Sequence, residues 1–238
     1  VVTRSRRQAS RLAHALRRLG AEPLVTPVIE ISDPSDGGVA QAAAVDRVGT
    51  YDWVVVTSPN GAERLLAALP DARALGGVRV AAIGPGTAAR LAEGNIVADL
   101  VPERYVAESL LEALPDPPAT DGSVLIARAA VARDVLPEGL AAAGWHVDVV
   151  EAYRTRPVIP ADADRAAVAT ADIVTFTSSS TVENFVAAFG VDAVPPVVAC
   201  IGPVTAATAR ELGLTVDVEA TTHTIDGLLE ALTTFTSP

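Results

Sequence analysis

The sequence predicts an α/β protein of two similar domains, each with three layers, in which helices cover both faces of a parallel sheet. Short apolar runs alternate with amphipathic or Ala-rich helical patterns along the chain, and this alternation is typical of parallel sheets. The chain has 238 residues, enough for two domains. It also repeats itself, because AAIGPGTAAR at 81–90 returns as ACIGPVTAATAR at 199–210. We therefore expect an internal duplication.

Further pairs of segments accompany the repeated IGPxTAA. Ile83 and Ile201 lie 118 residues apart (201 − 83), and Thr57 and Thr177, in VVVTSP and IVTFTSS, lie 120 apart (177 − 57). The remaining pairs are 3–20 with 127–144 and 105–114 with 222–232. Four matches in one order indicate a duplication. Any two α/β halves share a general pattern, but a near-constant spacing argues against that alternative.

Each element is expected from a local pattern. The first helix carries Leu12, Leu16 and Leu19 on one face and ends at Gly20. Strands are expected at apolar runs, and helices where apolar positions recur at helical spacing. The expected strands are 1–3, 22–31, 53–56, 78–83, 97–101, 124–127, 146–153, 173–176, 197–201 and 215–218. The expected helices are 8–19, 41–48, 59–69, 87–93, 107–114, 134–143, 181–189, 205–212 and 225–232. The expected linkers are 32–38, 115–122 and 154–160.

Composition excludes several classes of function. The net charge is −11 and all basic residues are arginines, which argues against nucleic acid as a partner. No apolar run reaches the roughly 18–20 residues of a membrane span. One cysteine, Cys200, cannot form an internal disulfide, and we find no zinc pattern and no Gly-rich nucleotide loop. We expect a cytoplasmic protein without metal or cofactor, and we expect no leader, although a start at Val1 suggests a trimmed N-terminus.

The ordered set of motifs resembles the uroporphyrinogen-III synthase family, which closes the ring in tetrapyrrole biosynthesis. The matching stretches are 2–31 (VTRSRRQASRLAHALRRLGAEPLVTPVIEI), 51–65 (YDWVVVTSPNGAERL), 80–91 (VAAIGPGTAARL), 133–155 (RDVLPEGLAAAGWHVDVVEAYRT) and 175–213, from TFTSSSTVENF to ACIGPVTAATARELG. Each motif is weak alone, but together they cover nearly the whole chain in the right order.

The resemblance implies how the chain divides into domains. The duplication alone would cut the chain near 115–122, whereas the family has two flavodoxin-like domains joined by a two-stranded hinge. One domain would then comprise 1–31 with 158–238 and the other 36–151, with connectors at 32–35 and 152–157. The linkers at 32–38 and 154–160 fit this division better. The cleft between the domains would be the active site.

The resemblance also implies the reaction. The substrate would be hydroxymethylbilane, a linear tetrapyrrole with many carboxylates, whose terminal hydroxyl leaves as water. The last ring would then be attacked at its substituted carbon, and a spiro intermediate would fragment and reclose with that ring inverted. The bilane closes spontaneously to the uninverted type I isomer, so positioning should dominate catalysis. A general acid that assists departure of the hydroxyl is the one expected proton-transfer role.

Tyr153 is the candidate for this acid. It stands in EAYRT, at the position of the family's tyrosine most often linked to catalysis. The alternative is a strand tyrosine that packs its ring and leaves its hydroxyl in water. Because a normal phenol is a weak acid, we expect only a partial effect of its loss.

Hydroxyls and glycines at the carboxyl ends of strands are candidates for holding substrate carboxylates. Free N–H groups at helix starts favour anions, which reconciles an acidic protein with an anionic ligand. The alternative for each hydroxyl is a helix cap. Arg4 and Arg128 follow equivalent strands and would pair carboxylates directly, unless each forms an intramolecular ion pair. The other candidates are Thr57, Ser58, Gly84, Thr87, Thr177, Ser178, Ser179, Gly202 and Thr205.

Other residues carry less weight. His14, His146 and His223 show no catalytic or metal-ligand spacing, and Cys200 is expected in the core. The competing functional hypothesis is a non-catalytic clamp of the same fold that senses a tetrapyrrole or another anion. A solute-binding protein is a weaker alternative. We expect a monomer that makes transient contact with the enzyme that supplies the bilane.

Overall fold

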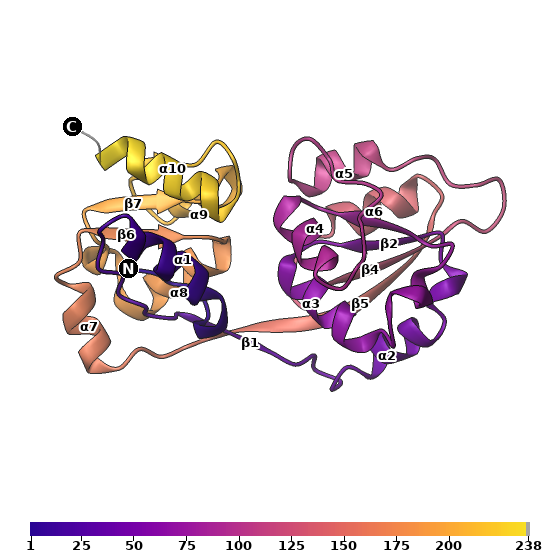
Figure 1. Ribbon diagram of the computed structural model, residues 1–238, viewed down its shortest axis with the longest axis horizontal. Coiled ribbons are helices and arrows are strands. Elements are labelled where there is room, and N and C mark those ends of the chain that lie inside the picture. Colours follow the sequence, from indigo (N-terminus) through magenta and orange to yellow (C-terminus); the bar gives the residue numbers. More distant parts are fainter. Residues whose placement is uncertain (237–238) are drawn as a thin grey trace. The chain divides into compact units, whose positions relative to one another are not determined.

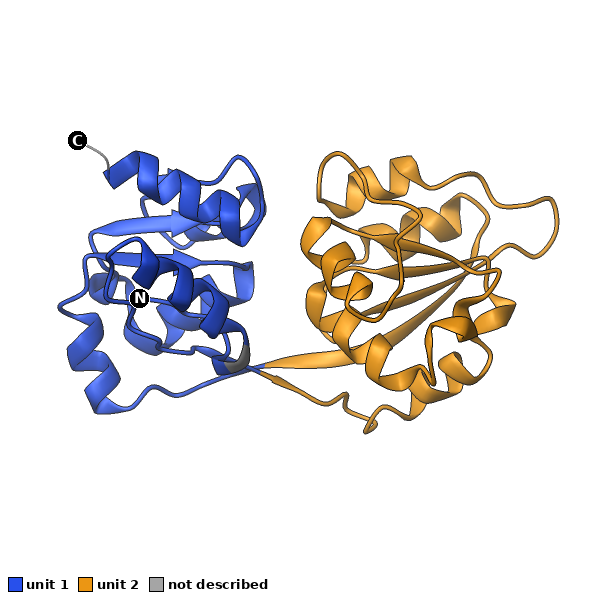
Figure 2. Cartoon of the chain, viewed as in Figure 1, with its two compact units in different colours: residues 1–30, 156–238 blue, residues 31–155 orange. Residues whose placement is uncertain are grey.

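The computed structural model describes residues 1–236, the side chain of Arg7 apart, and forms two compact units (Figure 2). Unit 1 combines residues 1–30 with the chain from residue 156 onward, and unit 2 comprises Ile31–Thr155. The chain passes from one unit to the other in strand β1 (Ile29–Ser32) and again in strand β5 (His146–Pro157). These two strands are hydrogen-bonded neighbours. The predicted connector at 152–157 is the end of a long strand, which fits the two-stranded hinge that the resemblance implies.

Unit 2 contains a five-stranded sheet in the order β1-β5-β4-β2-β3 (Figure 1). Strand β2 (Trp53–Val56) pairs in parallel with β3 (Arg79–Ala82) and β4 (Ser123–Ala129), and β4 pairs in parallel with β5. The α-helices of this unit are α2 (Val39–Asp46), α3 (Pro59–Ala68), α4 (Pro85–Ala92), α5 (Ala107–Ala113) and α6 (Val135–Ala142). Short 3-10 helices occur at Val48–Thr50 and Ala72–Leu75.

Strand β2 shows why unit 2 has three layers. Successive side chains of a strand point to opposite faces. Val54 and Val56 belong to one apolar cluster, whereas Trp53 and Val55 belong to another. The first cluster includes Leu65 of α3 and the second includes Leu110 of α5. Helices therefore cover both faces of the sheet.

Unit 1 has the same plan. Strands β6 (Ile173–Phe176), β7 (Val197–Cys200) and β8 (Val218–Glu219) are parallel, and Val2 bridges Thr175 on one side and Val25 on the other. Phe176 packs edge-on against Phe185, with ring centroids 5.5 Å apart. The helices are α1 (Arg6–Arg18), α7 (Asp162–Val168), α8 (Ser179–Phe189), α9 (Pro203–Glu211) and α10 (Ile225–Thr236), with a 3-10 turn at Val191–Ala193. The predicted α/β fold with parallel sheets is confirmed.

Two predicted strands are wrong over most of their length. Residues 22–28 form only a bridge at Val25, because Pro23 and Pro27 have no N–H group to donate to a ladder. Residues 97–101 form only the bridge between Leu100 and Ala81, because the Asp99 carboxylate takes the N–H of Val80 at 2.7 Å.

The ends of other elements also differ from the prediction. Residues 1–3 form only the bridge at Val2. In unit 1 the Asp217 carboxylate accepts from Val198 N–H at 2.9 Å, and β8 is short and begins only at Val218. Helix α7 was not predicted, because only Val168 of its residues is buried and it has no apolar stripe. No helix within residues 1–236 is long and apolar enough to cross a membrane.

Candidate active site

Residues predicted for the site in unit 2 lie at the carboxyl ends of its parallel strands. Thr57 and Ser58 follow β2, Gly84 follows β3, and Arg128 lies at the end of β4. Tyr153 of β5 is in register with Ala129, the last residue of β4. The register of the sheet, rather than proximity in the chain, thus brings these groups to one edge.

Tyr153 combines a packed ring with a bonded hydroxyl. Its side chain belongs to the core of unit 2 and the residue is only 7% exposed. Its Oη lies 3.0 Å from Oγ of Ser58. Ser58 in turn starts α3, where its Oγ accepts the N–H of Gly61 at 3.0 Å. Ser58 is thus a helix cap, which was the alternative to carboxylate binding, and the same oxygen also contacts Tyr153.

The repeated Ile-Gly-Pro turns each bring a ring close to a glycine. A Cβ on Gly84 would lie 3.0 Å from Cβ of Tyr105, and a Cβ on Gly202 would lie 2.8 Å from Cδ2 of His223. Tyr105 and His223 are 118 residues apart (223 − 105), the spacing of the two Ile-Gly-Pro turns. Sequence reasoning gave these two residues no role, although the spacing was a signal that connected them.

Helices α4 and α9 begin at these glycines without a side-chain cap. Pro85 and Pro203 occupy the first helical turn, where a missing N–H costs nothing. Thr87 is 2% exposed and Thr205 is 5% exposed. Within residues 1–236 neither hydroxyl forms a hydrogen bond. The starts of both helices therefore keep backbone N–H groups that can donate hydrogen bonds to an anion.

Three hydroxyls that follow β6 have different surroundings in unit 1. Ser178 starts α8 and accepts the N–H of Thr181 at 3.3 Å, and its Oγ lies 3.0 Å from Oγ of Ser180. Ser179 is bonded to Thr208 of α9 through their hydroxyl oxygens, 2.7 Å apart. Thr177 is half-buried. Ser178 is thus a cap and Ser179 joins two helices, whereas Thr177 has neither task.

The two predicted arginines differ in their partners. Arg128 donates to the carboxylate of Asp134 at 2.6 Å and to the carbonyl of Arg133 at 3.0 Å, and its side chain is 16% exposed. Arg4 is half-buried, and its guanidinium has no ion pair and no hydrogen bond within the described residues. Burial, and secondarily the charge of Arg11, lowers the pKa of Arg4. Among the described residues, Arg4 is therefore a partly desolvated cation without an anionic partner.

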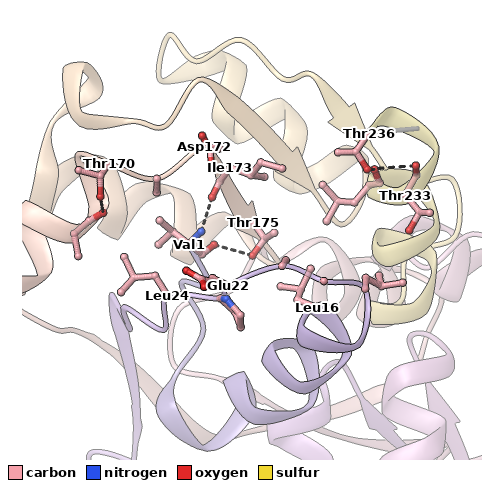
Figure 3. Close-up of a pocket in the computed structure, with 17 residues that line it drawn as sticks. Val1, Leu16, Glu22, Leu24, Thr170, Asp172, Ile173, Thr175, Thr233 and Thr236 are labelled. Atoms are coloured by element: carbon pink, nitrogen blue, oxygen red, sulfur yellow. Dashed lines mark hydrogen bonds between the residues drawn. The ribbon is translucent and has the colours of Figure 1, made fainter. Parts of the chain in front are cut away.

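Unit 1 also contains a cavity of about 680 Å³ (Figure 3). It is lined by Leu16, Leu24 and Ile173, among others, and by none of the predicted site residues. Ile173 begins β6, whereas Thr177 follows the opposite end of that strand. We therefore do not assign this cavity to the candidate site. Within residues 1–236, no group of three or more His, Cys, Asp or Glu side chains is placed to hold a metal ion.

Comparison with known proteins identifies the family. The family model described as "Uroporphyrinogen-III synthase HemD" matches residues 10–230. This chain belongs to the uroporphyrinogen-III synthase family. It is 34% identical to the uroporphyrinogen-III synthase of Synechococcus elongatus, over 98% of this chain and 93% of that protein. The porphyrin biosynthesis protein HemD of Ruminiclostridium josui is 30% identical over 98% of this chain, which spans 47% of that longer protein.

A solved structure of the family has the same fold. A mutant uroporphyrinogen III synthase from the extremely thermophilic bacterium Thermus thermophilus matches with a TM-score of 0.67 and 21% identity, over 98% of this chain and 97% of that one. Family membership, relatives and structure agree with the predicted cyclising lyase of porphyrin biosynthesis. None of these matches supports the competing hypothesis of a non-catalytic clamp.

Proposed function

We propose that this chain is a uroporphyrinogen-III synthase, which converts hydroxymethylbilane into uroporphyrinogen III with loss of one water and inversion of the last ring. The observation that carries the proposal is the Tyr153 hydroxyl, which lies at the carboxyl edge of the sheet and is held by Ser58 at 3.0 Å. Because the chain belongs to this family, the reaction offers this hydroxyl a role as the proton donor.

Tyr153 is the general acid in this proposal. Its phenol donates a proton to the terminal hydroxyl of the bilane, which leaves as water while the electron pair of the pyrrole nitrogen forms the azafulvene. The substituted carbon of the last ring attacks the exocyclic carbon, and the spiro intermediate breaks one bond and forms another with the ring inverted. Loss of a proton from the closing carbon restores the phenol, so the net change is loss of one water. Proton donation of this kind contributes on the order of 10²–10⁴-fold.

Arg4 and the starts of α4 and α9 hold and orient the carboxylates in this proposal. Arg4 is suited to a direct ion pair, because a desolvated guanidinium that has no partner among the described residues gains most from a carboxylate. The uncapped starts of α4 and α9 offer backbone N–H groups near Thr87 and Thr205. Such contacts select one conformation of the flexible bilane, which decides between the two isomers.

A coupled assay tests the function. Hydroxymethylbilane is generated in situ, this protein is added, and the oxidised products are separated into type I and type III isomers by chromatography. We expect mostly type III. Type I alone, from protein shown to be folded by circular dichroism, would overturn the proposal and return the non-catalytic clamp to consideration.

The setting of the reaction is also part of the proposal. We place it in the cytoplasm, in keeping with a single, buried cysteine. We propose that the monomer is the active form. Transient contact with the enzyme that forms the bilane would shorten the time in which the substrate closes spontaneously.

A further inference from the structure

We infer that Ser58 is a positioning residue for Tyr153, and that it supports the proton transfer instead of binding a substrate carboxylate. The inference rests on the proposed function and names one further residue in it. It is carried by two hydrogen bonds that meet at one oxygen: Ser58 Oγ lies 3.0 Å from Tyr153 Oη and 3.0 Å from the N of Gly61.

The Ser58 hydroxyl can serve both states of Tyr153. Gly61 N–H can only donate, so Ser58 Oγ accepts that bond and keeps its own hydrogen and a second lone pair. In the contact between Ser58 Oγ and Tyr153 Oη either hydroxyl can donate. When Ser58 donates, the Tyr153 proton is free to point at the departing hydroxyl. After transfer, the same Ser58 O–H donates to the phenolate, and hydrogen bonds to a charged acceptor are the stronger ones.

Close packing at Gly61 fixes the oxygen in place. A Cβ at Gly61 would lie 3.1 Å from the carbonyl oxygen of Ala127 and 3.3 Å from Ser58 Oγ. The first turn of α3 therefore sits directly against the end of β4, and a Cβ at this position would push a neighbour back by a few tenths of an ångström. Because the donor is held by the helix and the helix is held by the sheet, Ser58 Oγ has little freedom to leave Tyr153.

The duplicated unit shows that a cap alone does not require this arrangement. Ser178, 120 residues after Ser58, caps α8 through the N–H of Thr181, and its Oγ bonds the neighbouring Ser180. Ile29, 124 residues before Tyr153, stands where the other copy has the tyrosine. The Ser–Tyr contact thus exists in one unit only. Its two members are 95 residues apart in the chain and meet only through the sheet.

A double-mutant cycle on formation of the type III isomer tests the inference. Ser58→Ala is expected to lower kcat about 3- to 10-fold, the effect of one hydrogen bond, with KM within about twofold. Tyr153→Phe is expected to lower kcat on the order of a hundredfold. In the Tyr153→Phe background, Ser58→Ala should change kcat less than about twofold, because a residue that acts through Tyr153 has nothing left to support. Ser58→Thr keeps a hydroxyl and should restore most of kcat.

Thr224→Ala is the matched control for the lost cap. Thr224 Oγ1 accepts the N–H of Gly227 at 3.0 Å, the same bond length as at Ser58, but at the start of α10 in unit 1, whereas Tyr153 belongs to unit 2. This variant should lose comparable stability and keep kcat and KM, with all proteins assayed at a temperature at which circular dichroism shows them folded.

Additive effects of Ser58→Ala and Tyr153→Phe, or a loss at Ser58 that appears in KM alone, would overturn the positioning role and return Ser58 to the carboxylate-binding set. Wild-type protein that yields only type I would instead overturn the proposed function, and the positioning role with it. The two failures are therefore distinguishable within one set of assays.

Discussion

Replacing Arg4 with Gln removes a half-buried guanidinium that has no ion-pair partner in the described residues. We expect KM for the bilane to rise while the free energy of unfolding stays constant or increases. Burial lowers the pKa of Arg4, which means that the fold disfavours its charge and gains nothing from it. A charge-assisted hydrogen bond contributes about 1.5–3 kcal/mol, so its loss should lower kcat/KM about 10- to 150-fold.

Arg128→Gln is the comparison, because this arginine occupies the equivalent place in unit 2 and already has a carboxylate. Its ion pair with Asp134 at 2.6 Å and its bond to the carbonyl of Arg133 are both lost in the variant. We expect the unfolding free energy to fall by about 1 kcal/mol and KM to change little. The two substitutions should thus have opposite effects on binding and on stability.

Steady-state kinetics of type III formation and urea unfolding of both variants measure the two quantities. A clear loss of stability in Arg4→Gln without a change in KM would refute the reasoning, because it would show that the guanidinium serves the fold. A rise in KM for Arg128→Gln that matches the rise for Arg4→Gln would show that the Asp134 pair opens to the substrate.

Three further outcomes follow from single sites. Burial, together with a bond to Asp148 at 2.6 Å, raises the pKa of Tyr51 from 10 to about 12. Between about pH 10 and 12 the folded chain holds this proton while the unfolded chain has lost it, so wild-type stability falls across that window by up to about 3 kcal/mol. In urea titrations Tyr51→Phe should lack this part of the pH dependence. Burial raises the pKa of Cys200 to about 12, so a disulfide reagent at pH 8 should label it only after denaturation, and rapid labelling of folded protein would contradict this. Gly202→Ala places a methyl group against His223 and should cost about 1–3 kcal/mol by thermal or urea unfolding, with an unchanged midpoint as the contrary result.

Local patterns predicted the parts of the fold that depend on burial. Residues 53–56 are all buried, and the apolar run gives the bounds of β2 without error. The repeated Gly-Pro turns located α4 and α9, although both helices begin at the proline, two residues before the predicted starts at 87 and 205. Edge segments were less predictable, because aspartate side chains replace backbone partners there.

The contacts of the candidate site depend on register and on loop conformation, which no periodicity encodes. Ser58 and Tyr153 meet because β2, β4 and β5 align, so the sequence could name both residues but not their bond. The ion pair of Arg128 depends on the path of the short segment before α6. The sequence left open whether each arginine binds substrate or an internal carboxylate. In the structure Arg128 pairs with Asp134, whereas Arg4 has no carboxylate partner among the described residues.

The duplication explains why two similar units differ in these groups. Two carboxyl edges offer twice the helix starts and hydroxyls, which suits a substrate with many carboxylates, and both copies keep an Ile-Gly-Pro turn followed by a threonine. Only one hydroxyl leaves in the proposed reaction, so one acid is enough. The copy with Ile29 in place of the tyrosine has the arginine without a partner among the described residues, and the copy with Tyr153 has the arginine that is already paired. An unpaired arginine next to Tyr153 would stabilise the phenolate and oppose return of its proton. Turnover is therefore favoured when one residue, Arg4, binds carboxylate and another, Tyr153, donates the proton.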